Sequence, residues 1–203
     1  MTLIITGITV LLSLLALSNQ ELMQKLIFNP YLVNKKKEWW RFFTSGFIHA
    51  DFIHLAINMF VLYGFGKAVE DYFSEVYDDK ATYYFIMLYF GGMLISNAPT
   101  YAKNKNNYLY NSLGASGAVS AILFAAILFN PWSQIYIWGV IGIPGIILGP
   151  LYLFYEYRAS GRGGDNINHD AHFWGAVFGI IFPVLLKPAL GLAFIQVLLG
   201  GPQ

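Results

Sequence analysis

The chain contains apolar runs long enough to cross a lipid bilayer, and these runs constrain its fold more than any other feature. A membrane-spanning helix needs about 20 apolar residues. Hydrophobic side chains make up 57% of the 203 residues and charged ones 11%, against about 25% charged in an average soluble domain. We therefore predict an all-α, polytopic membrane protein. The predicted spans cover residues 3–18, 46–66, 81–98, 115–129, 134–154 and 169–186.

The whole chain, residues 1–203, is predicted to form a single transmembrane domain, because a length of 203 residues leaves no room for a sizeable second domain. The first run lacks the basic residues that precede the apolar region of a signal peptide, so we expect a retained span. Residues 187–203 hold an apolar stretch too short to span, and we predict a short interfacial tail there. A Trp-Trp-Arg sequence at 39–41 is typical of an anchor at the membrane interface.

Composition excludes several classes of function. The chain has no cysteine, which removes disulfides, thiolate metal sites and a cysteine nucleophile. A formal net charge of +1 argues against nucleic-acid binding. The sequence also lacks the phosphate-binding loop of ATP-driven machines. We expect an activity inside the lipid bilayer that needs no metal or other cofactor.

Polar residues inside apolar runs are costly to bury in a membrane, so each one marks a candidate functional site. In the second run His54 and Asn58 are four residues apart and share one helix face. His49 lies five residues before His54, about 140° away around a helix. It therefore belongs to another face or to the entrance of the helix.

The fourth and sixth runs carry a serine and a histidine beside small residues. The fourth run opens with Gly114, Ala115, Ser116 and Gly117, a short pattern that also occurs wherever helices pack closely. The sixth run contains His172, with glycines three and seven residues further along the same face. Small residues there would let the two helices approach closely and bring His172 towards Ser116.

Three of these polar residues, His54, Ser116 and His172, lie near the beginning of even-numbered runs. Even-numbered spans run parallel, so the three side chains should lie towards the same side of the bilayer. A nucleophile, a base and hydrogen-bond donors at one level are what acyl transfer requires.

The chain resembles the rhomboid intramembrane serine proteases of the bacterial six-span type. It carries their Trp-Arg pair at 40–41, their H-x4-H-x3-N pattern from His49, their G-x-S-G from Gly114 and their A-H-x2-G-x3-G from Ala171. The resemblance implies a six-transmembrane-helix bundle of rhomboid type. It also implies a serine endopeptidase that hydrolyses peptide bonds in or near transmembrane helices of single-pass or polytopic membrane-protein substrates.

Carried over residue by residue, the resemblance assigns the chemistry to two residues. Ser116 would attack the scissile carbonyl, with His172 as general base and later general acid. The side chains of His54 and Asn58 and the N–H of Ser116 would hold the oxyanion, with Gly114 in the same site. Ser116 at the start of a helix would also place the positive end of the helix dipole beside the developing charge.

Some details go beyond the matched motifs. In some relatives an aromatic residue four positions after the serine stacks on the histidine, whereas here that residue is Ser120. We expect Phe124 or Trp174 to brace His172 instead. Asp170 lies about 160° from His172 around a helix, so we leave it out of the site. The fifth span with the glycine-rich loop 155–168 is the predicted lateral gate and cap.

The basic residues conflict with the orientation that the resemblance implies. Nine of the twelve lie in the loops before the even-numbered spans, which the positive-inside rule would place in the cytoplasm. Bacterial relatives open their sites to the extracytoplasmic side. Following the resemblance, we expect a bacterial inner membrane and an extracytoplasmic site. The nine residues are Lys25, Lys35, Lys36, Lys37, Arg41, Lys103, Lys105, Arg158 and Arg162.

Two other functions remain open. A catalytically inactive, rhomboid-like protein that binds membrane clients would share the fold. A small transporter or channel could use the four histidines as proton or metal ligands, but their spacings of five and three residues differ from the usual zinc pattern, and Ser116 would have no role. The sequence does not indicate an oligomeric state.

Overall fold

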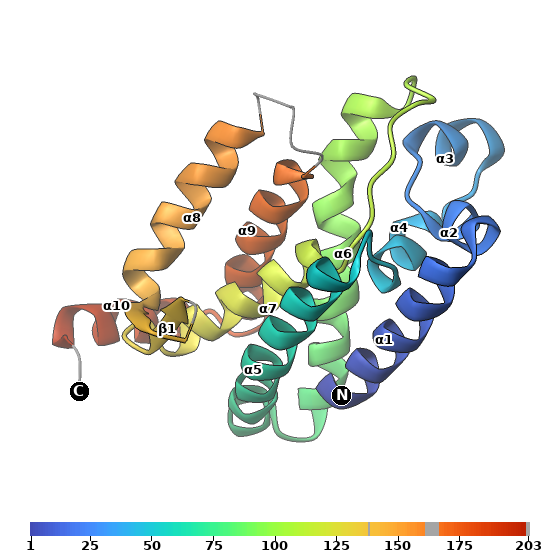
Figure 1. Cartoon of the computed structure of the whole chain (residues 1–203). Coiled ribbons are helices and arrows are strands. Elements are labelled where there is room, and N and C mark those ends of the chain that lie inside the picture. The colour runs from blue at the N-terminus through green and yellow to red at the C-terminus, as the bar shows by residue number, and fades with distance from the viewer. Residues whose placement is uncertain (138, 161–166, 202–203) are drawn as a thin grey trace.

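The computed structural model describes residues 1–137, 139–160 and 167–201, which form a bundle of helices with a small β-hairpin (Figure 1). The elements in chain order are α1 (Thr2–Ser18), α2 (Gln20–Leu26), α3 (Pro30–Lys36), α4 (Arg41–Thr44), η1 (Ser45–Phe47), α5 (Phe52–Tyr77), η2 (Asp78–Lys80), α6 (Ala81–Asn104), α7 (Ser116–Phe129), β1 (Gln134–Ile137), β2 (Ile141–Pro144), α8 (Gly145–Ala159), α9 (His169–Leu186) and α10 (Ala189–Gly200).

Helix α7 forms the centre of the bundle. Most of its residues are buried, and it packs against α5, α6 and α9. Helices α5, α7 and α9 run in one direction while α6 and α8 run in the other (Figure 1). The starts of α5, α7 and α9, which carry the candidate residues, therefore face the same end of the bundle.

Helices α7 and α9 approach each other closely, and glycine makes this possible. A Cβ atom placed on Gly175 would lie 2.1 Å from the carbonyl oxygen of Gly117, and one on Gly179 would lie 2.2 Å from that of Ala121. No side chain larger than hydrogen fits at these two positions without moving a helix. The predicted close packing of these two helices is confirmed.

The second predicted span is displaced along the chain. Helix α5 begins at Phe52, because the Asp51 side chain caps it by accepting a hydrogen bond from the N–H of His54 at 2.7 Å. It then continues through residues 67–77, which we predicted as a polar connector. That segment contains no glycine or proline to end the helix before Asp78, whose positive φ of 48° does so.

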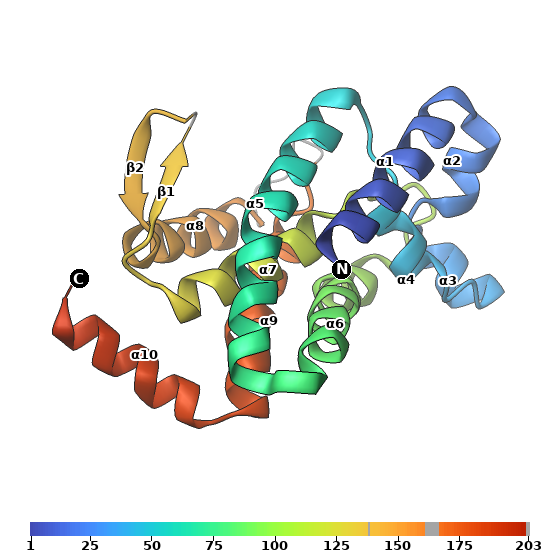
Figure 2. The same ribbon diagram turned by 90° about the horizontal axis from the view of Figure 1, so that it is seen from below.

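The prediction of a continuous fifth span over 134–154 is wrong. Strands β1 and β2 pair as an antiparallel hairpin, and helix starts only at Gly145 (Figure 2). Pro144 explains the boundary, because proline disfavours helical backbone at the residue before it. The predicted connector begins too early as well, because α8 extends to Ala159. The loop glycines that we predicted as a cap fall in 161–166, outside the described residues.

Two stretches of the described chain are long and apolar enough to cross a membrane. They are Phe52–Asn104, which comprises α5 and α6, and His169–Leu186, which is α9. Helices α1, α7 and α10 are apolar but shorter. Large apolar side chains also lie on the outer surface, as at Phe60, which is 78% exposed. A surface of this kind fits a lipid environment.

The connection between α1 and α5 lies at the side of the bundle and packs against α6, and Arg41 holds it (Figure 1). Arg41 is 5% exposed, and its guanidinium donates to the carbonyl oxygens of Ile27 at 2.6 Å and Gln24 at 2.9 Å, with Glu38 as its ion-pair partner at 2.5 Å. The neighbouring tryptophans at 39 and 40 stay half exposed. The tryptophans fit the predicted interface anchor, whereas the arginine is an internal brace.

Candidate active site

Ser116 is the first residue of α7, and the chain turns sharply to reach it. Gly114 has a φ of 117°, a backbone conformation that residues with a side chain rarely adopt. The first N–H groups of any helix, here those of Ser116 and the residues after it, have no carbonyl partner within the helix. These free donors and the helix dipole make the start of α7 a place where negative charge is stabilised.

His49 anchors the turn before Ser116. It is fully buried, its Nε2 accepts a hydrogen bond from the N–H of Ala115 at 3.3 Å, and its Nδ1 lies 2.9 Å from the Oγ of Ser13. Because Ser13 donates its own proton to the carbonyl oxygen of Phe47, His49 Nδ1 is the donor to Ser13. His49 is therefore a neutral structural residue that joins α1 to the start of α7. It lies before the start of α5, at the helix entrance, which is one of the two positions that the sequence left open.

His54, in the first turn of α5, lies against the same turn at Gly114. A Cβ atom on Gly114 would lie 2.9 Å from His54 Nε2, so the absence of a side chain at 114 makes room for the imidazole. Asn58 is buried one turn further along α5, and its Nδ2 donates to the carbonyl oxygen of His54 at 2.9 Å. The second N–H of that amide is the one left for another acceptor.

His172 lies in the first turn of α9, one turn before the Gly175–Gly117 contact. That contact brings α9 against the start of α7, so Ser116 and His172 lie on facing helices at the same end. Within the described residues no hydrogen bond joins these two side chains. Catalytic hydrogen bonds are often long in a free enzyme and tighten only when substrate binds.

The residue whose carboxylate contacts His172 is Glu156, which the sequence analysis did not predict as part of the site. Glu156, on α8, is 3% exposed and lies with its Oε1 3.1 Å from His172 Nδ1. Our expectation that Phe124 or Trp174 stacks on His172 is wrong, because among the described residues the ring beside His172 is that of His169, whereas Phe124 and Trp174 pack against Tyr152 and Phe173. An acidic residue beside an apolar run is a signal in itself, but we had placed Glu156 in a loop.

Three described groups lie close enough to hold a metal ion: Glu156, His169 and His172, whose ligand atoms lie within 4.8 Å of one another. However, the distances from the Glu156 carboxylate to the two imidazoles are those of hydrogen bonds. Glu156 Oε2 lies 2.5 Å from His169 Nδ1, whereas ligand atoms at tetrahedral zinc are about 3.3 Å apart. The carboxylate therefore bonds directly to both imidazoles.

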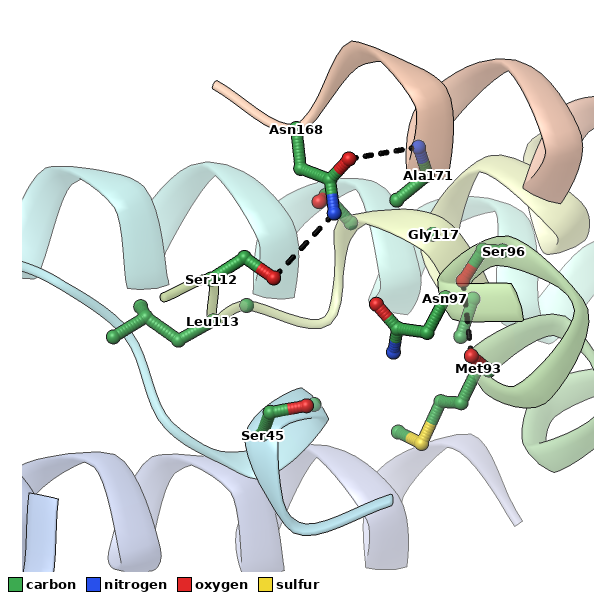
Figure 3. Close-up of a pocket in the computed structure, with 13 residues that line it drawn as sticks. Ser45, Met93, Ser96, Asn97, Ser112, Leu113, Gly117, Asn168 and Ala171 are labelled. Atoms are coloured by element: carbon green, nitrogen blue, oxygen red, sulfur yellow. Dashed lines mark hydrogen bonds between the residues drawn. The ribbon is translucent and has the colours of Figure 1, made fainter. Parts of the chain in front are cut away.

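A small cavity opens beside Ser116. It has a volume of about 20 Å³, about enough for one water molecule. Side chains of α6 and the segments that begin α7 and α9 line it, and the Asn168 amide closes one side by donating to the Oγ of Ser112 at 3.4 Å and accepting from the N–H of Ala171 at 3.2 Å (Figure 3). Ser96 and Asn97 add polar groups from α6. A hydrolytic water could reach Ser116 from here.

The helical bundle has an apolar exterior, a serine at the start of one helix and a histidine in the first turn of the helix packed against it, which defines a membrane-embedded protein with a candidate serine-hydrolase site. A family model of the Rhomboid domain matches residues 36–189. The chain belongs to the rhomboid family, whose members are membrane proteins and include proteases.

Curated relatives agree with this membership. The chain is 29% identical over 153 residues to RHOMBOID-like protein 12, mitochondrial, of Arabidopsis thaliana, covering 68% of this chain and 44% of the relative. It is 27% identical over 172 residues to Rhomboid-like protein 11, chloroplastic, of the same plant, covering 77% and 56%. It is 34% identical over 92 residues to the Putative rhomboid protease YdcA of Bacillus subtilis, covering 45% and 41%. The matched region spans about half the length of these relatives.

Proposed function

We propose that this chain is an intramembrane serine endopeptidase that hydrolyses peptide bonds in or near transmembrane helices of single-pass or polytopic membrane proteins. The observation that carries the proposal is the glycine contact between α7 and α9, which brings Ser116 and His172 onto facing helices. Membership of a family that includes proteases supports it.

The mechanism follows from the chemistry of the two side chains. Ser116 Oγ attacks the scissile carbonyl carbon while His172 accepts its proton, and His172 then gives that proton to the leaving amine. Negative charge on the carbonyl oxygen is stabilised by the free N–H groups at the start of α7 and by the side chains of His54 and Asn58. A water from the adjoining cavity hydrolyses the acyl-enzyme.

The test is labelling with a fluorophosphonate, which reacts with activated serines. Wild-type protein in detergent should label, and Ser116→Ala should not, because the probe bonds to the Ser116 Oγ. Ser120→Ala is the matched control, since Ser120 lies one turn further along α7 and bonds to the Tyr152 hydroxyl at 2.9 Å. Labelling that persists in Ser116→Ala would show that another residue is the nucleophile.

His54→Ala should lower turnover by about 10²- to 10³-fold, the usual cost of losing one oxyanion donor. The thermal midpoint should change little, because His54 is only partly buried and, within the described part of the chain, its imidazole makes no hydrogen bond. We would measure kcat on a reconstituted membrane-protein substrate together with the thermal midpoint. An unchanged kcat would remove His54 from the oxyanion site.

The inactive, client-binding alternative remains a second candidate for one reason. The described structure has no hydrogen bond between Ser116 and His172, and a protein that only binds clients would need none. Folded wild type that fails to label would favour this candidate. A transporter built on four histidines is less well supported, because His49 is committed to structural hydrogen bonds.

The same proposal covers the membrane organisation. We place six crossings in the bilayer, with α1, α5, α6, α7, α8 and α9 as the spans and the site open to the extracytoplasmic side of a bacterial inner membrane. Membership of the family supports the membrane location, whereas the bacterial setting rests on the sequence resemblance alone, because the plant relatives carry mitochondrial and chloroplastic names. Accessibility of single cysteines introduced at Ser112 and Asp78 to a membrane-impermeant reagent in cells would test the orientation.

A further inference from the structure

Helix α8 brings a buried carboxylate between two histidines of α9. Glu156 Oε2 lies 2.5 Å from His169 Nδ1, and Oε1 lies 3.1 Å from His172 Nδ1. Glu156 and His169 are buried, at 3% and 4% exposure, and the His172 side chain is 18% exposed. Helices α8 and α9 pack side by side here (Figure 1). Each carboxylate oxygen therefore has its own imidazole partner.

These contacts determine which nitrogen of His172 carries the proton. An ionised carboxylate has no proton to donate, so it acts only as an acceptor. His172 Nδ1 must then be the protonated nitrogen of a neutral imidazole, which leaves Nε2 with a free lone pair. A general base needs that free nitrogen, and it needs the ring to be held in one orientation.

The neighbouring contacts of α8 and α9 hold Glu156 in place. Tyr152 lies four residues before it, on the same face of α8, and its hydroxyl bonds to the Oγ of Ser120 on α7 at 2.9 Å. The ring of His169 meets that of His172 edge-on, with centroids 6.1 Å apart. The carboxylate thus reaches His172 from a helix that is itself docked on α7, and no aromatic residue is needed at position 120 to orient the ring.

We propose that Glu156 is a positioning residue that holds His172 in its Nδ1-protonated form, so that Ser116, His172 and Glu156 form a serine–histidine–carboxylate triad built from α7, α9 and α8. The inference rests on the proposed serine peptidase function. As His172 Nε2 takes the proton of Ser116, the imidazole becomes positively charged, and the Glu156 carboxylate stabilises that charge while remaining ionised.

The experiment combines a spectroscopic and a kinetic readout on the full chain in detergent. Nitrogen NMR of protein labelled with ¹⁵N-histidine distinguishes the two neutral forms of each imidazole, and His172→Gln identifies the signals of His172. In wild type we expect His172 protonated on Nδ1. In Glu156→Gln we expect this preference to be lost and the fluorophosphonate labelling rate to fall by about 10²- to 10⁴-fold, as when the orienting carboxylate of a triad becomes an amide.

The matched control is Asp170→Asn, which makes the same kind of carboxylate-to-amide change near His172, but at a side chain that pairs with Lys103 and Ser160 and not with His172. We expect its His172 signals to match wild type. A wild-type spectrum that shows His172 protonated on Nε2 would overturn the proposal. An unchanged labelling rate in folded Glu156→Gln would also overturn it. Zinc bound to purified wild type and lost from Glu156→Gln together with activity would replace the positioning role by a metal site. Wild type that does not label refutes the peptidase function, while its NMR spectrum still decides whether Glu156 holds His172.

Discussion

His172→Ala is expected to abolish cleavage of a single-pass membrane substrate in proteoliposomes, with a loss of about 10⁵- to 10⁶-fold. Removing the base of a serine–histidine pair lowers kcat about as much as removing all the catalytic residues together, because serine is a weak nucleophile without its base. The fold should survive, since the glycine contacts of α9 lie further along the helix and do not involve the imidazole. The measurement is the initial rate of product formation on a substrate helix with Gly, Ala and Ser at the cut.

Asp170→Asn is the matched control for His172→Ala. Asp170 lies two residues away on the same helix, but it pairs with Lys103 at 2.7 Å and accepts from the Ser160 hydroxyl. A carboxylate that faces α6 and the end of α8 has no part in the proposed chemistry, so the rate should stay close to wild type. An equal loss in both variants would mean that the start of α9 matters for folding and not for proton transfer.

The sequence predicted the parts of the site that lie within short motifs. The spacing of Gly175 and Gly179 behind His172 correctly indicated the close α7–α9 contact, and residues 169–186 form α9 as expected. Both predictions rest on interactions repeated every three or four residues along one helix, which sequence spacing reports directly.

The parts that were missed depend on contacts between distant segments. Glu156 lies 16 residues before His172, and its partner is decided by how α8 docks, which no local spacing reveals. The hairpin at 134–144 was missed because its isoleucines and valine are as apolar as those of a membrane helix. Hydropathy reports how apolar a segment is. It does not distinguish a short pair of apolar strands from part of a membrane-spanning helix.

Gly175→Val is expected to destabilise the protein by about 3 kcal/mol or more, beyond the usual cost of an overpacked core. The first added carbon would lie 2.1 Å from the carbonyl oxygen of Gly117. That oxygen belongs to the backbone of the central helix and cannot rotate away as a side chain would, so α9 must move from α7. Thermal unfolding in detergent, followed by circular dichroism, measures the loss.

Gly64→Ala supplies the control for Gly175→Val. Gly64 also lies within a helix, but a Cβ atom there would meet nothing within 4 Å. Alanine stabilises a helix interior by about 0.5–1 kcal/mol relative to glycine, so this variant should unfold at the same or a higher temperature. Gly175→Val should also lose fluorophosphonate labelling in any fraction that remains folded, because separating α9 from α7 moves His172 away from Ser116. A folded Gly175→Val that labels at the wild-type rate would show that the two residues are brought together by something other than the glycine contact.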